Sequence, residues 1–211
     1  MIAILDYGVG NLFSLRSSLQ QLGLQAVVTA DADAIRAADR LILPGVGAFG
    51  DAMAKLTATG LVPVLKEQAE EKPLLGICLG CQILLEHSEE NDVRTLGIVP
   101  GRCVRFPDHM KEEDGSPAPV PHMGWNSLDV VRPGRLLHGI EPGAEFYFVH
   151  SYYVEPAPEL VMATTVYGKE FCSVYGRDGL WAVQCHLEKS GRPGLTVLRN
   201  FYDYCDEVRH A

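Results

Sequence analysis

The stretch LLGICLGCQILLEHS, residues 74–88, decides the fold class because a buried-strand pattern runs directly into a helical pattern. Between the two patterns, Cys78 lies between Gly76 and Gly80. This arrangement matches the nucleophile elbow, G-x-S-x-G, with cysteine in place of serine. Glycines at these positions relieve steric crowding at a sharp strand-to-helix turn. The helix expected over residues 79–88 begins with free N–H groups that favour a thiolate. Cys78 is therefore a candidate nucleophile.

Other roles for Cys78 are open at this point: a small buried packing residue, or one half of a Cys78-x-x-Cys81 redox or zinc motif. Structural zinc needs a second pair of ligands, and the adjacent Cys185 and His186 are awkward ligands for one tetrahedral ion. A redox role is disfavoured because Cys81 lies one turn inside the helix. We therefore expect no metal and no other cofactor. We also expect reduced thiols at all six cysteines, which are residues 78, 81, 103, 172, 185 and 205.

The first half of the chain alternates short apolar runs with helical patterns. This predicts an α/β fold with a parallel sheet and helices on both of its faces. Strands are expected at residues 2–5, 25–29, 41–43 and 73–77, and helices at residues 12–22, 31–38, 51–71 and 79–88. Asn11 is expected to cap the first helix, and breaks in the third are expected near Gly60 and Pro63. Ligands of such sheets gather at the carboxyl ends of the strands.

The second half predicts a smaller antiparallel portion, with strands in the runs AEFYFVHSYYV, ELVMATTVY, EFCSVYG and LWAVQCH. Residues 107–121 are polar and rich in proline, so we expect an exposed loop or hairpin there. A C-terminal helix is expected, with one apolar side formed by Leu195, Leu198, Phe201 and Cys205.

Length and composition restrict the class of protein. A chain of 211 residues with 47% hydrophobic and 21% charged residues suits one globular domain, which we place at residues 1–211. The net charge of 18 − 27 = −9 argues against nucleic acid or an anionic membrane as a main partner. No apolar run reaches the length of a membrane span. The start MIAILDYGVGN lacks a basic segment, so we expect no signal peptide and a cytoplasmic location.

A thiolate that attacks a carbonyl group needs a nearby group to accept and donate protons. His186 follows the last predicted strand, and Glu188 comes two residues later. On an extended backbone these two side chains point to one side, so the carboxylate can hold the ring in one tautomer. The alternative is a surface histidine with an acidic neighbour. His122 and His150 are competitors for the role, although their aromatic surroundings favour packing.

An acyl-transfer transition state also needs N–H donors for its oxyanion. The N–H of Leu79, at the start of the helix, is one candidate donor. The loop PGVGAFG can supply a second from Val46 or Gly47. An ordinary strand-to-helix turn is the alternative interpretation of this loop.

Several motifs of this sequence together resemble those of a known protein family. GICLGCQ followed by HLE is similar to the class I (triad) glutamine amidotransferases. DYGVGNLFSL, PGVGAFGDAM, PHMGWN and FYFVHSYY resemble, within that class, the glutaminase subunits of imidazole glycerol phosphate synthase, the HisH family. The resemblance spans Asp6 to Ser190 and implies a flavodoxin-like three-layer fold.

The resemblance also implies a function. Such subunits hydrolyse L-glutamine to glutamate and ammonia through a cysteinyl thioester. The ammonia passes into a (β/α)8-barrel cyclase subunit (HisF type), with which the glutaminase forms a heterodimer. The barrel makes imidazole glycerol phosphate and an aminoimidazole carboxamide ribotide (AICAR) in histidine biosynthesis.

The resemblance implies a role for each matching residue. Cys78 corresponds to the nucleophile, His186 to the base and acid, and Glu188 to its orienting partner. The oxyanion-hole positions correspond to Val46, Gly47 and Leu79. The contacts to glutamine correspond to Gly47, Gln82, Glu90, Ser151 and Tyr152. The face turned toward the cyclase corresponds to Asn11, His122, Trp125, Asn126 and Lys189.

The sequence departs from the family pattern in three places. Leu187 replaces the usual proline of H-P-E, and we expect activity to persist because leucine can adopt the same backbone. Cys81 replaces the usual methionine before Gln82. The acidic insertion at residues 107–119 has no assigned purpose.

Three other functions are alternatives: another triad amidotransferase, a stand-alone cysteine amidase, and a non-catalytic scaffold or regulatory subunit. PHMGWN and FYFVHSYY disfavour the first two, and the presence of all three triad residues disfavours the last. We further expect low activity of the lone chain, because the PGVG loop is expected to present a carbonyl group in place of an N–H until a partner binds.

Overall fold

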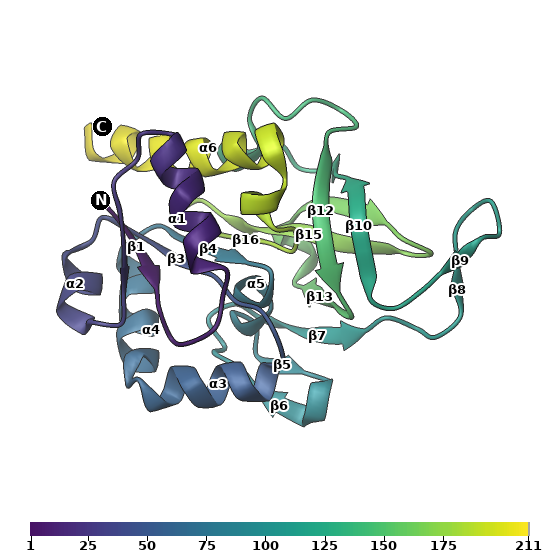
Figure 1. Ribbon diagram of the computed structural model, residues 1–211, viewed down its shortest axis with the longest axis horizontal. Helices are drawn as coiled ribbons and strands as arrows, with labels where there is room; N and C mark the ends of the chain where they lie inside the picture. Colours follow the sequence, from purple (N-terminus) through teal and green to yellow (C-terminus); the bar gives the residue numbers. More distant parts are fainter. Residues whose placement is uncertain (211) are drawn as a thin grey trace.

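The computed structural model describes residues 1–210, with side chains described as far as residue 204. Its centre is a sheet of 12 strands (Figure 1). One half of this sheet is parallel, in the order β2-β1-β3-β4-β16. The bounds of these strands are Ala26–Thr29 (β2), Ile2–Leu5 (β1), Arg40–Leu43 (β3), Leu74–Ile77 (β4) and Leu180–Val183 (β16). The predicted parallel sheet is confirmed.

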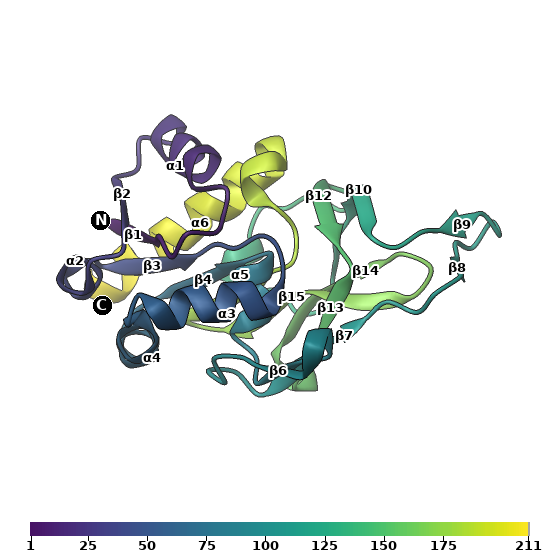
Figure 2. The ribbon, with the colours of Figure 1, turned by 60° about the horizontal axis from the view of Figure 1, so that its bottom comes forward.

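Helices cover both faces of the parallel half, which confirms the three-layer arrangement (Figures 1 and 2). Successive side chains of a strand point to opposite faces, so Ile2 and Ile4 enter one core while Ala3 and Leu5 enter the other. The first core is covered by α1 (Leu12–Gln21) and α6 (Gly191–His210). The second core is covered by α2 (Ala32–Ala37), α3 (Phe49–Ala58), α4 (Leu61–Glu71) and α5 (Leu79–Ile83).

The second half of the sheet is mainly antiparallel, as predicted. Strand β16 joins the halves, because it pairs in parallel with β4 and antiparallel with β15. The other strands of this half are β15 (Glu170–Arg177), β14 (Val161–Val166), β13 (Tyr152–Pro156), β11 (Asp129–Val130), β7 (Gly101–Arg105), β6 (Val93–Arg94) and β5 (His87–Ser88). Short 3-10 helices lie between strands: η1 (Glu90–Asp92), η2 (Arg135–Leu137), η3 (Pro158–Leu160) and η4 (Leu187–Lys189).

Two pairs of strands lie outside the main sheet. An antiparallel ribbon is formed by β10 (His122–Ser127) and β12 (Glu145–His150). The proline-rich segment forms a hairpin of β8 (Met110–Lys111) and β9 (Pro117–Ala118), which projects from the rest of the chain in Figure 2. The expected loop or hairpin is therefore a hairpin.

Three local predictions were wrong in whole or in part. Helix α5 ends at Ile83 and not at residue 88, because backbone N–H groups from residues 96–99 bind the carbonyl groups of residues 83–85 and end the helix. The expected break near Gly60 is confirmed, since α3 ends at Ala58 and α4 begins at Leu61. Pro63 does not break a helix: it is the third residue of α4, where no intrahelical N–H donor is needed. Asn11 occupies the N-cap position of α1, but its side chain makes no capping hydrogen bond.

The topology places four loops at one edge of the sheet. Because β1, β3, β4 and β16 run in the same direction, their carboxyl ends meet there. The segments that follow these ends are DYGVGN, PGVG, Cys78 and QCHLE. Within residues 1–210, none of the helices combines the length and apolarity that crossing a bilayer requires.

Candidate active site

The strand-to-helix turn at Cys78 has the geometry of a nucleophile elbow. Its backbone has φ 54° and ψ −114°, in the region of positive φ that side chains with a Cβ atom rarely adopt. A Cβ atom on Gly80 would lie 1.8 Å from the Leu43 carbonyl oxygen. One on Gly76 would lie 2.7 Å from Leu84 Cδ1 and 3.0 Å from the backbone of Cys81. Close packing therefore requires glycine on both sides, as the sequence predicted. Cys78 is 6% exposed and lines a pocket of about 330 Å³.

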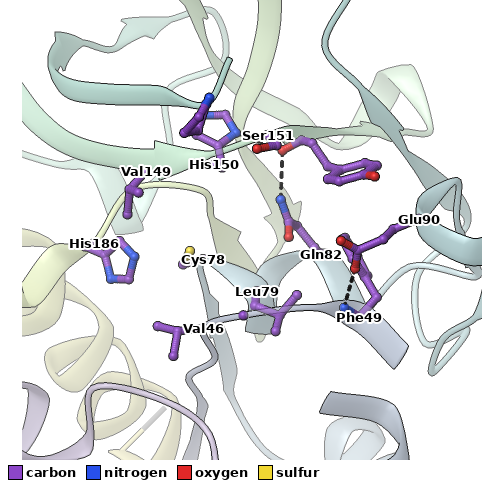
Figure 3. A pocket seen from close by; sticks show the side chains of 13 residues that line it. Val46, Phe49, Cys78, Leu79, Gln82, Glu90, Val149, His150, Ser151 and His186 are labelled. Atoms are coloured by element: carbon purple, nitrogen blue, oxygen red, sulfur yellow. Dashed lines mark hydrogen bonds between the residues drawn. The ribbon is translucent and has the colours of Figure 1, made fainter. Parts of the chain in front are cut away.

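His186 lines the same pocket, and its ring lies beside Cys78 (Figure 3). Its Nδ1 atom is 2.8 Å from Glu188 Oε1. Its Nε2 atom is buried and makes no hydrogen bond with the described residues. Burial lowers the pKa of His186, but its interactions with Cys78 and Glu188 outweigh burial and raise the pKa to about 10. The protonated ring can donate a proton to a group that leaves beside the sulfur.

The contact between His186 and Glu188 arises differently from the prediction. The backbone is not extended through this segment, because Leu187–Lys189 form the 3-10 helix η4. Leu187 is the first residue of this helix, a position that suits proline, and its side chain is buried. Asn11 donates from Nδ2 to Glu188 Oε1 at 3.4 Å, so it contacts the carboxylate in place of capping α1.

One of the predicted oxyanion donors, the Leu79 N–H, is not free in this structure. The Leu79 N–H donates to the carbonyl oxygen of Gly45 at 3.3 Å. Tyr7, which no sequence motif indicated as a site residue, donates from its hydroxyl to the Pro44 carbonyl at 2.6 Å. This bond holds the residue that precedes Gly45 in the loop. Val46 lines the pocket with an exposed side chain. The expectation that the PGVG loop presents a carbonyl group is confirmed, while the low activity of the lone chain stays a prediction.

The other end of the pocket carries hydrogen-bond acceptors. Gln82 donates from Nε2 to the Tyr152 carbonyl at 2.8 Å and to Gln184 Oε1 at 3.0 Å. Glu90 Oε2 accepts the Phe49 N–H at 2.6 Å. The structure thus brings all of the predicted glutamine contacts to one pocket, whose lining includes Gly47, Gln82, Glu90, Ser151 and Tyr152.

Gln184 is a second residue of the site that the sequence motifs did not indicate. It lies two residues before His186, and its side chain is fully buried. Its position next to the HLE motif was the one sequence feature that could have indicated a role in the site. Its hydrogen bond to Gln82 could not be predicted, because Gln82 is 102 residues away in the chain.

The residues predicted to face a partner divide into two groups. Trp125 is 54% exposed and Lys189 is exposed, while Asn11 and Asn126 are partly buried. Trp125 packs edge-on against Tyr147 of the neighbouring strand β12. His122 is different, because its ring is 2% exposed. The prediction that His122 faces a partner is therefore wrong for its side chain, which points into an aromatic core.

The remaining cysteines pack in the interior. Cys81, Cys103, Cys172 and Cys185 are buried free thiols, and burial raises the pKa of each. Cys205 lies outside the described side chains. Among the described residues, no group of three or more histidine, cysteine, aspartate or glutamate side chains is placed to hold a metal ion.

Comparison with known proteins places this chain in one class. The family model for glutamine amidotransferase class-I matches residues 3–205. A solved structure of a glutamine amidotransferase superposes with a TM-score of 0.73 at 16% identity, covering 97% of this chain and 98% of that one. PurLQS from Thermotoga maritima superposes with a TM-score of 0.70 at 18% identity, covering 96% and 97%. At these identities the likeness concerns the fold alone.

Two curated relatives indicate which family within this class the chain belongs to. The imidazole glycerol phosphate synthase subunit HisH of Desulfovibrio desulfuricans is 62% identical over 216 residues, covering 100% of both chains. The protein of the same name from Nitratidesulfovibrio vulgaris is 59% identical over 212 residues, again covering 100% of both chains. The chain belongs to the class-I glutamine amidotransferases and, within them, to the HisH family of imidazole glycerol phosphate synthase subunits.

Proposed function

We propose that the chain is the glutaminase subunit of imidazole glycerol phosphate synthase, with Cys78 as nucleophile, His186 as acid and base, and Glu188 as the group that orients the ring. One observation carries the proposal: an elbow cysteine and a histidine bound to a buried carboxylate line the same pocket. The identity of 62% to a HisH subunit over the full chain selects this synthase among glutamine-dependent enzymes.

The reaction proceeds through a thioester. The Cys78 thiolate attacks the side-chain amide carbon of glutamine, and the C–N bond breaks as His186 donates its proton to the leaving nitrogen, which departs as ammonia. The neutral His186 ring then accepts a proton from water, whose oxygen attacks the thioester. Glutamate leaves, its side chain loses a proton to solvent, and the thiolate and protonated ring are restored. The bonds are made and broken by side chains and water, without a further reagent.

Glutamine lies with its amide at Cys78 and its amino-acid end at the acceptors. Glu90 and the side-chain oxygen of Gln82 bind the α-ammonium group. The backbone of Ser151 and Tyr152 holds the α-carboxylate end. This orientation uses the two chemically different ends of the pocket, with the nucleophile at one and hydrogen-bond acceptors at the other (Figure 3).

The oxyanion hole forms only after the loop changes conformation. The Gly45 carbonyl must leave the Leu79 N–H, and the N–H of Val46 or Gly47 then becomes the second donor. Gly47 has φ 95°, a conformation open to glycine, and nothing would contact a Cβ atom there. A partner that stabilises the rearranged loop therefore activates the enzyme, which supports the expectation of low activity in the lone chain.

The partner is a HisF-type (β/α)8-barrel cyclase, in a cytoplasmic heterodimer. The proposed contact face carries Asn11, Trp125, Asn126 and Lys189, and Asn11 also contacts the Glu188 carboxylate. A sealed interface keeps ammonia neutral and nucleophilic until it reaches the cyclase. One family model spans residues 3–205, which supports a single domain.

The test measures glutamate release by the chain alone, with the barrel subunit of the same organism, and with the barrel and its nucleotide substrate. We expect release to need the barrel, to rise with its ligand, and to vanish in Cys78→Ala. High activity of the lone chain favours a stand-alone amidase, and binding without any activity favours a scaffold. Activity retained in Cys78→Ala contradicts the thioester mechanism.

A further inference from the structure

Two buried histidines connect strand β10 to the glutamine pocket. His122 is 2% exposed and His150 is 5% exposed. The Nδ1 atom of His122 is 3.0 Å from His150 Nε2, and the Nδ1 atom of His150 is 2.8 Å from the Tyr152 carbonyl oxygen. The His122 ring stacks between Phe148 and Tyr167 at centroid distances of 4.9 Å and 4.0 Å. Two polar contacts thus run in series through an apolar cluster.

The Tyr152 carbonyl determines where each hydrogen of this series lies. A carbonyl oxygen can only accept, so His150 carries its hydrogen on Nδ1. Burial lowers the pKa of His150 to about 3 and that of His122 to about 4, so both rings are neutral at pH 7. The bare Nε2 of His150 therefore accepts the hydrogen on His122 Nδ1. His122 Nε2 is bare in turn, and it faces the Asn126 amide nitrogen at 3.5 Å.

The same carbonyl orients Gln82. Because the Tyr152 oxygen only accepts, Gln82 must turn its nitrogen toward it, at 2.8 Å. The second hydrogen of that nitrogen binds Gln184 Oε1 at 3.0 Å. Both amide hydrogens are then engaged, so the Gln82 oxygen is the atom left for a ligand in the pocket.

We infer that His122 and His150 are positioning residues that hold the Tyr152 carbonyl so that Gln82 presents its oxygen to the α-ammonium group of glutamine. The inference rests on the proposed glutaminase function and deepens it. His150 acts through Tyr152 and Gln82. His122 acts by keeping the His150 hydrogen on Nδ1, because without that donor His150 can turn a bare nitrogen toward the carbonyl oxygen. The two lone pairs would then repel each other.

The first test reads the tautomers directly. Long-range proton–nitrogen NMR of the nitrogen-15-labelled full chain at pH 7 distinguishes Nδ1–H, Nε2–H and charged rings. We expect the Nδ1–H form for both His122 and His150. An Nε2–H or charged ring at either residue overturns the inference. This measurement needs no catalysis, so it separates a failure of the inference from a failure of the proposed function.

The second test uses kinetics of the complex with its cyclase partner. His150→Phe keeps an aromatic ring and removes both hydrogen bonds. We expect the KM for glutamine to rise about tenfold, the equivalent of one hydrogen bond, and kcat to change by less than about threefold. His150→Asn, whose amide nitrogen can reach the position of Nδ1, is expected to restore most of the loss in KM.

Phe171→Leu is the matched control, because the Phe171 ring contacts both histidines without hydrogen-bonding to either. We expect this variant to lower Tm, because it removes buried ring atoms. We expect it to leave KM within about twofold of wild type, because it removes no hydrogen bond. An equal rise in KM for Phe171→Leu and His150→Phe, or no rescue by His150→Asn, overturns the inference. If His150→Phe does not fold, the tautomer measurement decides.

Discussion

Backbone strain at Cys78 gives a prediction that stability measurements can check. With φ 54° and ψ −114°, this residue occupies a conformation that costs a residue with a Cβ atom about 1–3 kcal/mol. Glycine avoids that cost but loses about 0.5–1 kcal/mol through the greater freedom of the unfolded chain. We therefore expect Cys78→Gly to be more stable than Cys78→Ala by about 1 kcal/mol. Comparing the two variants cancels the loss of the sulfur atom.

The assay is urea unfolding of the lone chain, followed by tryptophan fluorescence, with equal m values for the two variants. For a chain of 211 residues, the expected difference corresponds to about 2–4 °C in Tm. Neither variant is expected to hydrolyse glutamine, so stability alone is compared. Cys81 is the matched control: it lies buried inside α5, where glycine costs about 1 kcal/mol relative to alanine. The order of the two variants should reverse there. If Cys78→Ala is as stable as Cys78→Gly, the strain argument is refuted.

Four further predictions use the same structure. Gly80→Ala is expected to destabilise the chain by about 3 kcal/mol or more, because its Cβ atom would lie 1.8 Å from a carbonyl oxygen of β3. Gly50→Ala, at the second position of α3, is expected to stabilise it by about 0.5 kcal/mol, and urea unfolding of the pair checks both signs. Leu187→Pro is expected to keep the glutaminase activity of the complex within about twofold, since the first position of η4 needs no N–H donor; a large loss would contradict this. The lowered pKa values of His122 and His150, about 4 and about 3, mean that the unfolded chain binds more protons. The stability that these two neutral rings contribute is complete above pH 6.5 and is lost as the pH falls toward 4. The free energy of unfolding, measured across that range, should therefore decrease less in His122→Phe than in wild type.

Local patterns in the sequence were sufficient for the fold class and for the centre of the site. Alternating apolar runs and helical patterns determined a parallel sheet, because each strand is buried on both faces and needs helices to cover it. Gly76, Cys78 and Gly80 determined the elbow, since the crowding that excludes other residues arises within one strand-turn-helix unit and its neighbouring strand. The spacing of His186 and Glu188 brought that pair together even though the backbone between them is not extended.

Contacts between distant parts of the chain decided the rest. The end of α5 depends on backbone N–H groups from residues 96–99, and the Asn11 side chain binds Glu188, 177 residues away, in preference to capping its own helix. The burial of His122, its series of bonds to His150, and the carbonyl group on the Leu79 N–H follow from how β10, β12 and the PGVG loop pack. Sequence spacing carries no information about such contacts, because a polar group takes the partner that the assembled fold places within hydrogen-bond distance.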